Sequence, residues 1–189
     1  MKIGVLCAGE CPFGGGEGAI RPFIDALERV GLVRGRTLVL DIGSMLPSED
    51  QVVGEAQKLV SRRPDLILVW TGSVAAARAA KDATQTIPIV LMAVPDVVEH
   101  GLVDSLAHPG GNITGTSIPT YDLTIKQLQV LKEINPRLQR IVVVQGDLSR
   151  GDRHMVDRLR GAADSLRLQG GLVTRSEERR VGKECRSRW

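Results

Sequence analysis

The chain has 189 residues, of which 42% are hydrophobic, 25% charged and 3% aromatic, and its formal net charge is +3. This length allows one domain with a sizeable core, or one domain and part of another, and the hydrophobic fraction excludes wholesale disorder. No apolar run approaches the roughly 18 residues that cross a bilayer, so we predict no direct membrane insertion. Three cysteines are too few for a disulfide framework.

The basic excess lies entirely in the last 15 residues, 175–189. This segment carries six Lys/Arg and three Asp/Glu, which leaves 19 residues of each sign in 1–174. Its sequence, RSEERRVGKECRSRW, resembles the in-frame translation of a sequencing-library adapter at all 15 positions. We therefore expect a non-native tail on a neutral chain, which removes the basic surface that nucleic-acid binding requires.

The first 174 residues alternate between short apolar runs, typical of buried strands, and apolar residues at three- and four-residue spacing, typical of helices. The predicted strands are 2–9, 37–42, 66–70, 87–94, 112–117, 140–145 and the start of a seventh at 170–174. The predicted helices are 20–30, 48–60 (opened by a Ser48/Gln51 capping box), 74–83, 98–107, 123–134 and 155–168. This alternation indicates a doubly wound α/β architecture, in which helices cover both faces of a parallel sheet.

In such a sheet, ligands bind outside the carboxyl ends of the strands, so the loops that follow the strands contain the candidate site residues. Thr71, Gly72 and Ser73 follow the third strand and open a helix, where backbone N–H groups suit a carboxylate; plain helix capping requires the same residues. Asp96 follows the fourth strand, where it either accepts hydrogen bonds from a ligand amine or hydroxyl or caps the next helix.

Four further candidates lie in similar places. Gly9 ends the first apolar run, Phe13 lies in the glycine-rich loop that follows, Ser117 ends the fifth strand, and Tyr121 lies in the loop after it. Phe13 and Tyr121 either stack on a ligand ring or cover the rim of the core. Trp70 belongs to an apolar strand, which favours a place in the core.

Signals for catalysis are weak. The segment 14–19 matches Gly-x-Gly-x-x-Ala, and Asp41 lies near the end of the second strand, which leaves a nucleotide- or dinucleotide-dependent α/β enzyme as an alternative. The glycines, however, begin five residues after Gly9 rather than directly after the strand. The histidines lack metal-ligand spacing, and Cys7-x-x-x-Cys11 has no second pair. We predict no metal, no cofactor and no catalytic residue.

Two segments, 71–90 (TGSVAAARAAKDATQTIPIV) and 100–115 (HGLVDSLAHPGGNITG), resemble a bacterial family of ABC-transporter substrate-binding proteins with the periplasmic-binding-protein type I fold. Residues 31–35 and 128–144 are similar to the same family, and the likeness covers about residues 2–144. The family's Gly-Asp-Pro-Val stretch stands here as Pro-Asp-Val-Val, which retains Asp96.

The resemblance implies a receptor that closes on a small polar or aromatic, amino-acid-like solute and presents it to an ABC permease without chemical change. It implies a complete first lobe at 1–117, a hinge helix with part of a second lobe at 118–174, and hence impaired binding by the truncated chain. It also implies a periplasmic or lipoprotein-anchored location. No leader precedes the first strand, so we expect that either the natural start lies upstream or the gene fragment has lost it. The sensor domain of a transcription regulator shares this fold and is an alternative that requires an N-terminal helix-turn-helix.

Overall fold

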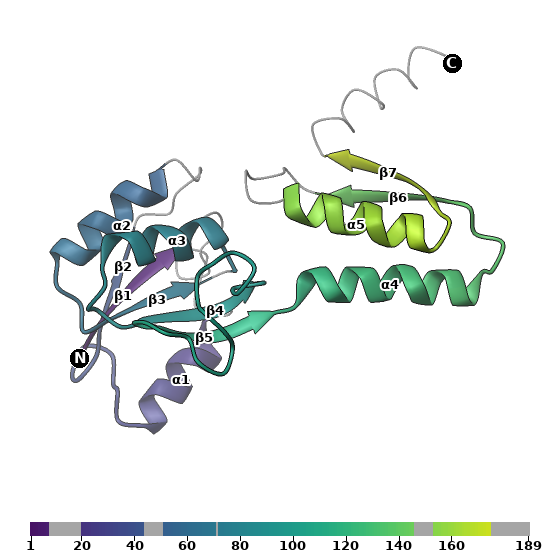
Figure 1. The fold of residues 1–189 in the computed structure, drawn as a ribbon. Helices are drawn as coiled ribbons and strands as arrows, with labels where there is room; N and C mark the ends of the chain where they lie inside the picture. The colour runs from purple at the N-terminus through teal and green to yellow at the C-terminus, as the bar shows by residue number, and fades with distance from the viewer. Residues whose placement is uncertain (8–19, 44–50, 71, 146–152, 175–189) are drawn as a thin grey trace, which may run out of the picture. The chain divides into compact units, whose positions relative to one another are not determined.

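The computed structural model of the chain describes residues 1–7, 20–43, 51–70, 72–145 and 153–174 (Figure 1). Contacts between residues divide the chain into two compact units, Met1–Ile118 and Pro119–Trp189, here called unit 1 and unit 2. Gly9, Phe13, Thr71, Ser48 and the tail 175–189 lie outside the described residues.

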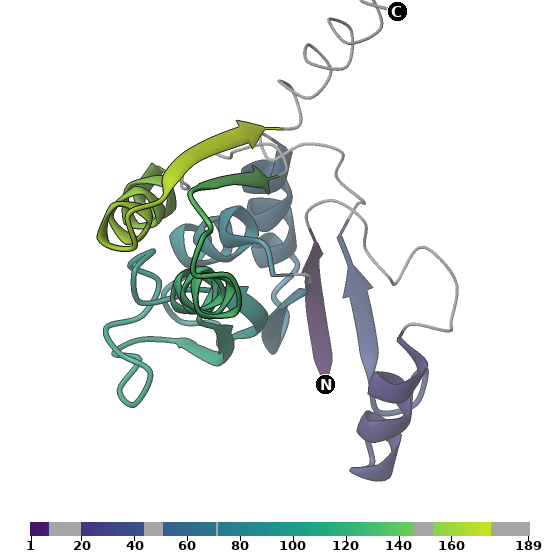
Figure 2. The same ribbon diagram turned by 90° about the vertical axis from the view of Figure 1, so that its right-hand side faces the viewer.

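Unit 1 contains a five-stranded sheet in which every pair of neighbouring strands is parallel. The strands are β1 (Lys2–Cys7), β2 (Val39–Ile42), β3 (Leu66–Trp70), β4 (Ile89–Pro95) and β5 (Ile113–Ile118). Their order in the sheet is β2-β1-β3-β4-β5, so β2 lies on one side of β1 and the strands from β3 onward are added on the other side. Figure 2 shows β1 and β2 side by side.

Helices cover both faces of this sheet, as the alternating pattern predicted. On one face α2 (Val52–Ser61) and α3 (Val74–Ala83) share a core with alternate residues of β3 and β4, and on the other α1 (Arg21–Arg29) packs against β1 and β3 (Figure 1). The rings of Phe23 in α1 and Trp70 in β3 meet edge to face, with centroids 5.1 Å apart. Trp70 is half-buried and packs against the core of this face, in agreement with its predicted place.

Unit 2 consists of α4 (Thr120–Ile134), β6 (Arg140–Gln145), α5 (Arg153–Ser165) and β7 (Gln169–Thr174). The two strands pair in parallel, and residues of both helices form a small core. The segment predicted to begin a seventh strand is thus β7. The α/β class and the parallel pairing predicted from the sequence are confirmed in both units.

The helix predicted at 98–107 is wrong, because the structure has only turns and bends there. Gly101 adopts φ +63°, a left-handed conformation that ends a helical turn. Beyond it, the N–H groups of Asp104 and Ser105 donate to the carbonyls of Pro109 and His108, which closes a second tight turn. As a result, no helix separates β4 from β5.

The predicted start of α2 at Ser48, with its capping box, lies outside the described residues and stays a prediction. The helix begins at Val52, and its N-cap is Gln51, whose side chain makes no capping hydrogen bond. The side chain of Val52 is buried and that of Gln51 is exposed, so burial of the apolar face begins at the point where the helix begins.

Candidate functional site

Four of the predicted site residues lie at the carboxyl ends of β3, β4 and β5, on the same side of unit 1. Gly72 and Ser73 follow β3, Asp96 follows β4, and Ser117 is the penultimate residue of β5. Because the three strands are neighbours in a parallel sheet, their ends lie next to each other. The sequence-based placement of these four residues at one sheet edge agrees with the topology.

Ser73 caps α3. Its hydroxyl oxygen accepts a hydrogen bond from the N–H of Ala76 at 3.1 Å, and its extended backbone (φ −79°, ψ 115°) is that of an N-cap residue. The predicted capping role is therefore confirmed. The same arrangement leaves the start of α3, with its partial positive charge, at the carboxyl end of β3.

Position 72 requires glycine for two reasons, its left-handed backbone conformation and the close approach of β4. Its φ is +65°, and a Cβ atom built on it would lie 2.9 Å from the carbonyl oxygen of Ala93 in β4. The loop that precedes α3 thus rests directly on the end of β4. Any larger residue would have to shift one of the two segments.

β4 is irregular where Gly72 touches it. The pairing register between β4 and β5 shifts between Leu91 and Val94, and Ala93 adopts φ +55°. The N–H of Ala93 donates to the side-chain hydroxyl of Thr116 at 2.9 Å. This β-bulge is the kind of irregularity that redirects a strand end beside a binding site. The sequence offered one sign of it, Gly115 within an otherwise regular strand pattern.

Asp96 is buried at the end of β4, with 4% of its surface exposed. Its N–H donates to the carbonyl of Ile118 at 3.0 Å, and its backbone is left-handed, at φ +45°. One residue later, the N–H of Val97 donates to the hydroxyl oxygen of Ser117 at 3.4 Å. The end of β5 therefore holds the start of the Asp96 loop through both backbone and side chain.

Tyr121 lies in unit 2, in the first turn of α4, so its predicted place in a loop is wrong. Its side chain is only 3% exposed and packs with Leu128 and Leu159. The guanidinium of Arg158 lies 5.6 Å from the ring centroid, a cation–π distance, and also pairs with Asp122 at 2.8 Å. These contacts match the core-covering alternative, and a ligand contact by Tyr121 stays a prediction.

Two sequence features left an enzyme as an alternative, Asp41 and the glycine-rich segment 14–19. The carboxylate of Asp41 pairs with Lys2 at 3.2 Å and Arg62 at 2.8 Å, and the segment 14–19 is not described. Within the described ranges, no group of three or more His, Cys, Asp or Glu residues is arranged to hold a metal ion.

Cys7 is disulfide-bonded, which no sequence pattern predicted. Among the helices described, none has both the length and the apolar character to cross a membrane.

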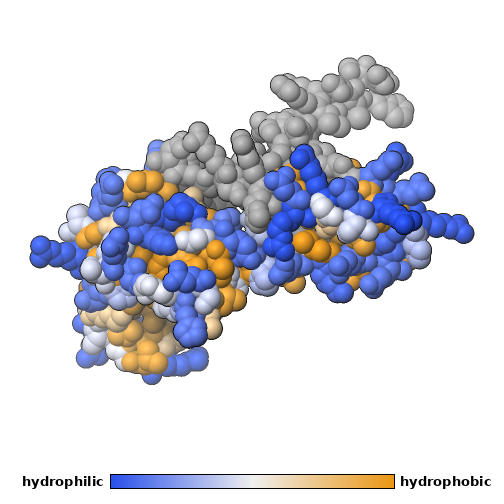
Figure 3. Space-filling view, in the orientation of Figure 1, coloured by the Kyte–Doolittle hydropathy of each residue, from blue (hydrophilic) through white to orange (hydrophobic). Residues whose placement is uncertain are grey.

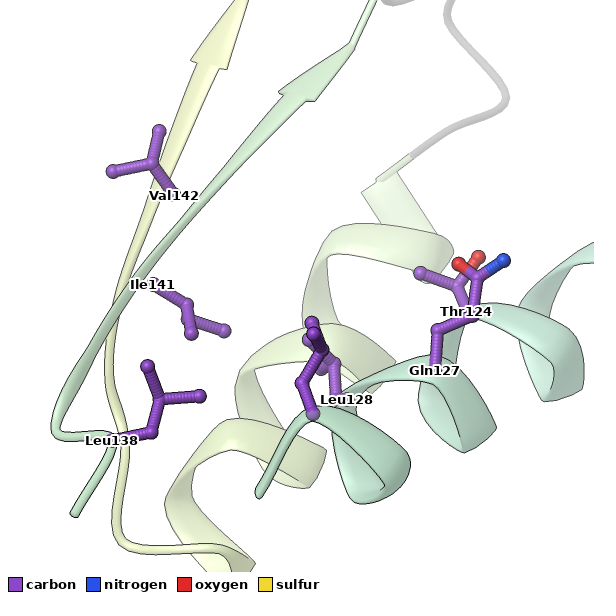
Figure 4. A pocket seen from close by; sticks show the side chains of 7 residues that line it. Thr124, Gln127, Leu128, Leu138, Ile141 and Val142 are labelled. Carbon is purple, nitrogen blue, oxygen red and sulfur yellow. The ribbon is translucent and has the colours of Figure 1, made fainter. Parts of the chain in front are cut away.

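Unit 2 carries an apolar groove of about 310 Å³ between α4 and β6. Figure 4 shows Leu138 and Ile141 directed from the β6 side toward Leu128 of α4. Nearby apolar side chains are exposed, among them Leu131 and Val142, and Figure 3 shows hydrophobic areas within the mostly hydrophilic surface of this unit. Among the described residues that line the groove none is charged, and the two polar ones, Thr124 and Gln127, both belong to α4.

Replacing Ser73 with alanine should destabilise unit 1 by about 1 kcal/mol, because the N–H of Ala76 loses its acceptor at the start of α3. The measurement is the midpoint of urea unfolding. Ser61→Ala is the control. Ser61 is the last residue of α2 and its hydroxyl donates to the carbonyl of Lys58, so its loss leaves no helix N–H without an acceptor and should change the midpoint less. Equal effects of the two substitutions would contradict a capping role for Ser73.

Unit 1 is an α/β unit with helices on both faces of a parallel sheet, an architecture in which ligands generally bind at the carboxyl ends of the strands. The family model described as ABC transporter substrate binding protein matches residues 16–169, which is most of the chain. The chain therefore belongs to this family, and its fold is of the periplasmic-binding-protein type I class.

Individual relatives agree with this assignment. A "Tyrosine-binding protein" of Clostridioides difficile (strain R20291) is 35% identical over 162 residues, covering 84% of this chain and 46% of that protein. A conserved domain protein from Vibrio cholerae has a TM-score of 0.74 at 27% identity, covering 92% of this chain and 56% of that one. A ligand-free, open substrate binding protein with adhesive properties from Clostridium difficile has a TM-score of 0.63 at 31% identity, covering 92% and 57%. The chain thus spans about half the length of these relatives.

Proposed function

We propose that the chain is part of a solute receptor. It binds a small, amino-acid-like solute with an aromatic side chain at the carboxyl ends of β3, β4 and β5. The observation that carries the proposal is the buried Asp96, which directly follows the end of β4 against which Gly72 packs, just before the Ser73-capped start of α3. An amino acid has one ammonium and one carboxylate group. Asp96 is suited to the ammonium, and the backbone N–H groups at the start of α3 are suited to the carboxylate.

The aromatic part of the proposal is supported by the tyrosine-binding relative, which is 35% identical over 84% of the chain. The family also supports delivery to an ABC permease in an extracytoplasmic compartment, and binding and release in place of catalysis. Since the chain spans about half the length of its relatives, we further propose that it supplies one side of the cleft and binds its solute less tightly than a two-lobed relative does.

The test is an NMR titration of the ¹⁵N-labelled chain with L-tyrosine, with L-lysine as the control. We expect L-tyrosine to shift the amide signals of Gly72, Ser73, Asp96 and Ser117. The Asp96→Asn variant should bind about tenfold more weakly, because a neutral amide replaces a charge-assisted partner of the ammonium. Asp104→Asn is the matched control, since Asp104 is an exposed acid of the same loop.

Three outcomes separate the parts of the proposal. Shifts confined to other parts of the chain, or none at saturating L-tyrosine, would contradict the proposed site. Equal shifts with L-lysine would contradict the aromatic preference and leave amino-acid binding supported. Micromolar binding of L-tyrosine by residues 1–174 alone would contradict the proposed impairment.

A further inference from the structure

The loop that carries Asp96 is organised as one hydrogen-bonded turn. The N–H of His100 donates to the carbonyl of Asp96 at 3.0 Å. The N–H groups of Gly101 and Leu102 donate to Val98 and Val97, both at 2.9 Å. Together with the left-handed Gly101, this is the Schellman pattern that ends helices. Asp96 therefore begins a closed turn whose last residues are His100, Gly101 and Leu102.

Two cations of α3 bind those last carbonyls. Arg78 donates through Nη2 to the carbonyl of His100 at 2.6 Å. Lys81 donates through Nζ to the carbonyls of Gly101 at 2.7 Å and Leu102 at 3.2 Å. The two residues are three apart in a helix and so lie on one face of it. Hydrogen bonds from charged groups are among the stronger ones in proteins, so these contacts tie the turn to α3.

The same helix presents the other half of the proposed site. α3 begins at the Ser73 cap, directly after Gly72, and the Gly72 backbone rests on β4 next to the residues that lead to Asp96. One rigid element thus holds both candidate ligand-binding segments, one at its start and the other along its side. A site held in its bound arrangement before the solute arrives avoids the cost of ordering it during binding.

We infer that Lys81 and Arg78 are positioning residues, which keep the Asp96 turn preformed on unit 1 in the absence of solute. The effect on binding rests on the proposed function; the effect on the turn does not. Neither cation is needed to start the turn, because β5 holds the backbone of Asp96 and the N–H of Val97 independently. Their removal should therefore loosen the far end of the turn while leaving the sheet intact.

Native-state hydrogen exchange of the full chain without solute tests the first part. In the Lys81→Met variant the amides of His100, Gly101 and Leu102 should exchange about tenfold faster, and adding Arg78→Met should increase the effect. Lys81→Arg should restore protection, because it returns a cationic donor. The amides of Ala77 and Ile89 serve as internal references. Unchanged exchange of the turn amides in the double variant would overturn the inference.

Lys58→Met is the matched control. Lys58 is an exposed lysine on α2 that pairs with Glu55 at 3.6 Å, away from the turn carbonyls. It should leave the exchange of Gly101 and Leu102 unchanged. Faster exchange of these amides in the control to the same extent would also overturn the inference, because it would show a general response to the loss of a surface charge.

Titration with L-tyrosine tests the link to binding through a double-mutant cycle. Lys81→Met should weaken binding about fivefold when Asp96 is present, and have no further effect when Asp96 has been replaced by asparagine. A loss that is equal in both backgrounds would overturn the positioning of Asp96. If the wild-type chain fails to bind L-tyrosine while Lys81→Met accelerates exchange in the turn, the proposed function fails and the preformed turn is supported.

Discussion

Replacing Gly115 with alanine is expected to lower the free energy of unfolding of unit 1 by about 4 kcal/mol. Gly115 has φ +140°, and a Cβ atom built there would lie 2.6 Å from the amide nitrogen of Leu91 and closer still to its carbonyl oxygen. The strained φ and the collision with a neighbouring backbone add to each other. Relief requires β5 to separate from β4 at the bulge, where the N–H of Ala93 already depends on Thr116.

The measurement is urea unfolding followed by tryptophan fluorescence, in a Trp189→Phe background so that Trp70 in β3 is the remaining tryptophan. Gly111→Ala is the control, since its backbone has no positive φ and a Cβ atom there would meet nothing within 4 Å. It should change stability by less than about 0.5 kcal/mol. A loss at Gly115 no larger than that at Gly111 would show that β4 and β5 do not approach this closely at the bulge.

Much of the fold followed from local patterns. Leu66–Trp70 is an uninterrupted apolar run, and a strand buried on both faces of a parallel sheet requires this composition. The serine before the alanine-rich α3 is both a pattern in the sequence and a hydrogen bond in the structure. Parallel topology then placed Ser73, Asp96 and Ser117 at one edge, because the carboxyl ends of all the strands lie at the same side of the sheet.

Other features depend on contacts between distant residues and leave little trace in the sequence. Ala93 combines its unusual backbone with a hydrogen bond from its N–H to Thr116, which is 23 residues away. The false helix at 98–107 has a related cause. Leu102 and Val103 are buried against the core from a turn. Val98 lies four residues before Leu102 and Leu106 three residues after Val103, a spacing that imitates the apolar face of a helix.

Tyr121 was predicted in a loop because the sequence marks no helix start before it, whereas packing of the core sets the actual start of α4. Pro119 is the N-cap of α4 and makes no side-chain capping hydrogen bond, so no capping signal marked the true start of the helix. Burial of Tyr121 with Leu128, seven residues along the same helix, extends the helix toward its N-terminus. A helix boundary of this kind is decided by the core that forms around it.

Replacing Gly72 with alanine should lower the free energy of unfolding by about 3 kcal/mol and also weaken the binding of L-tyrosine. The left-handed φ of +65° accounts for part of the loss, and the remainder comes from pushing the new methyl group against the Ala93 carbonyl, 2.9 Å away. That carbonyl belongs to the bulge that leads to Asp96. The displacement should therefore move the two proposed ligand-binding segments apart.

Gly35→Ala separates the two causes. Gly35 has φ +78° but nothing within 4 Å of a built Cβ atom, so alanine there should cost only the backbone strain, about 1 kcal/mol. The difference between the two variants, measured by urea unfolding, isolates the contact between Gly72 and the bulge. Equal losses would mean that the β3–α3 loop does not rest on β4. L-tyrosine binding that weakens in Gly72→Ala and stays unchanged in Gly35→Ala would connect this contact to the proposed site, because the control reproduces the strain without moving the Ala93 carbonyl.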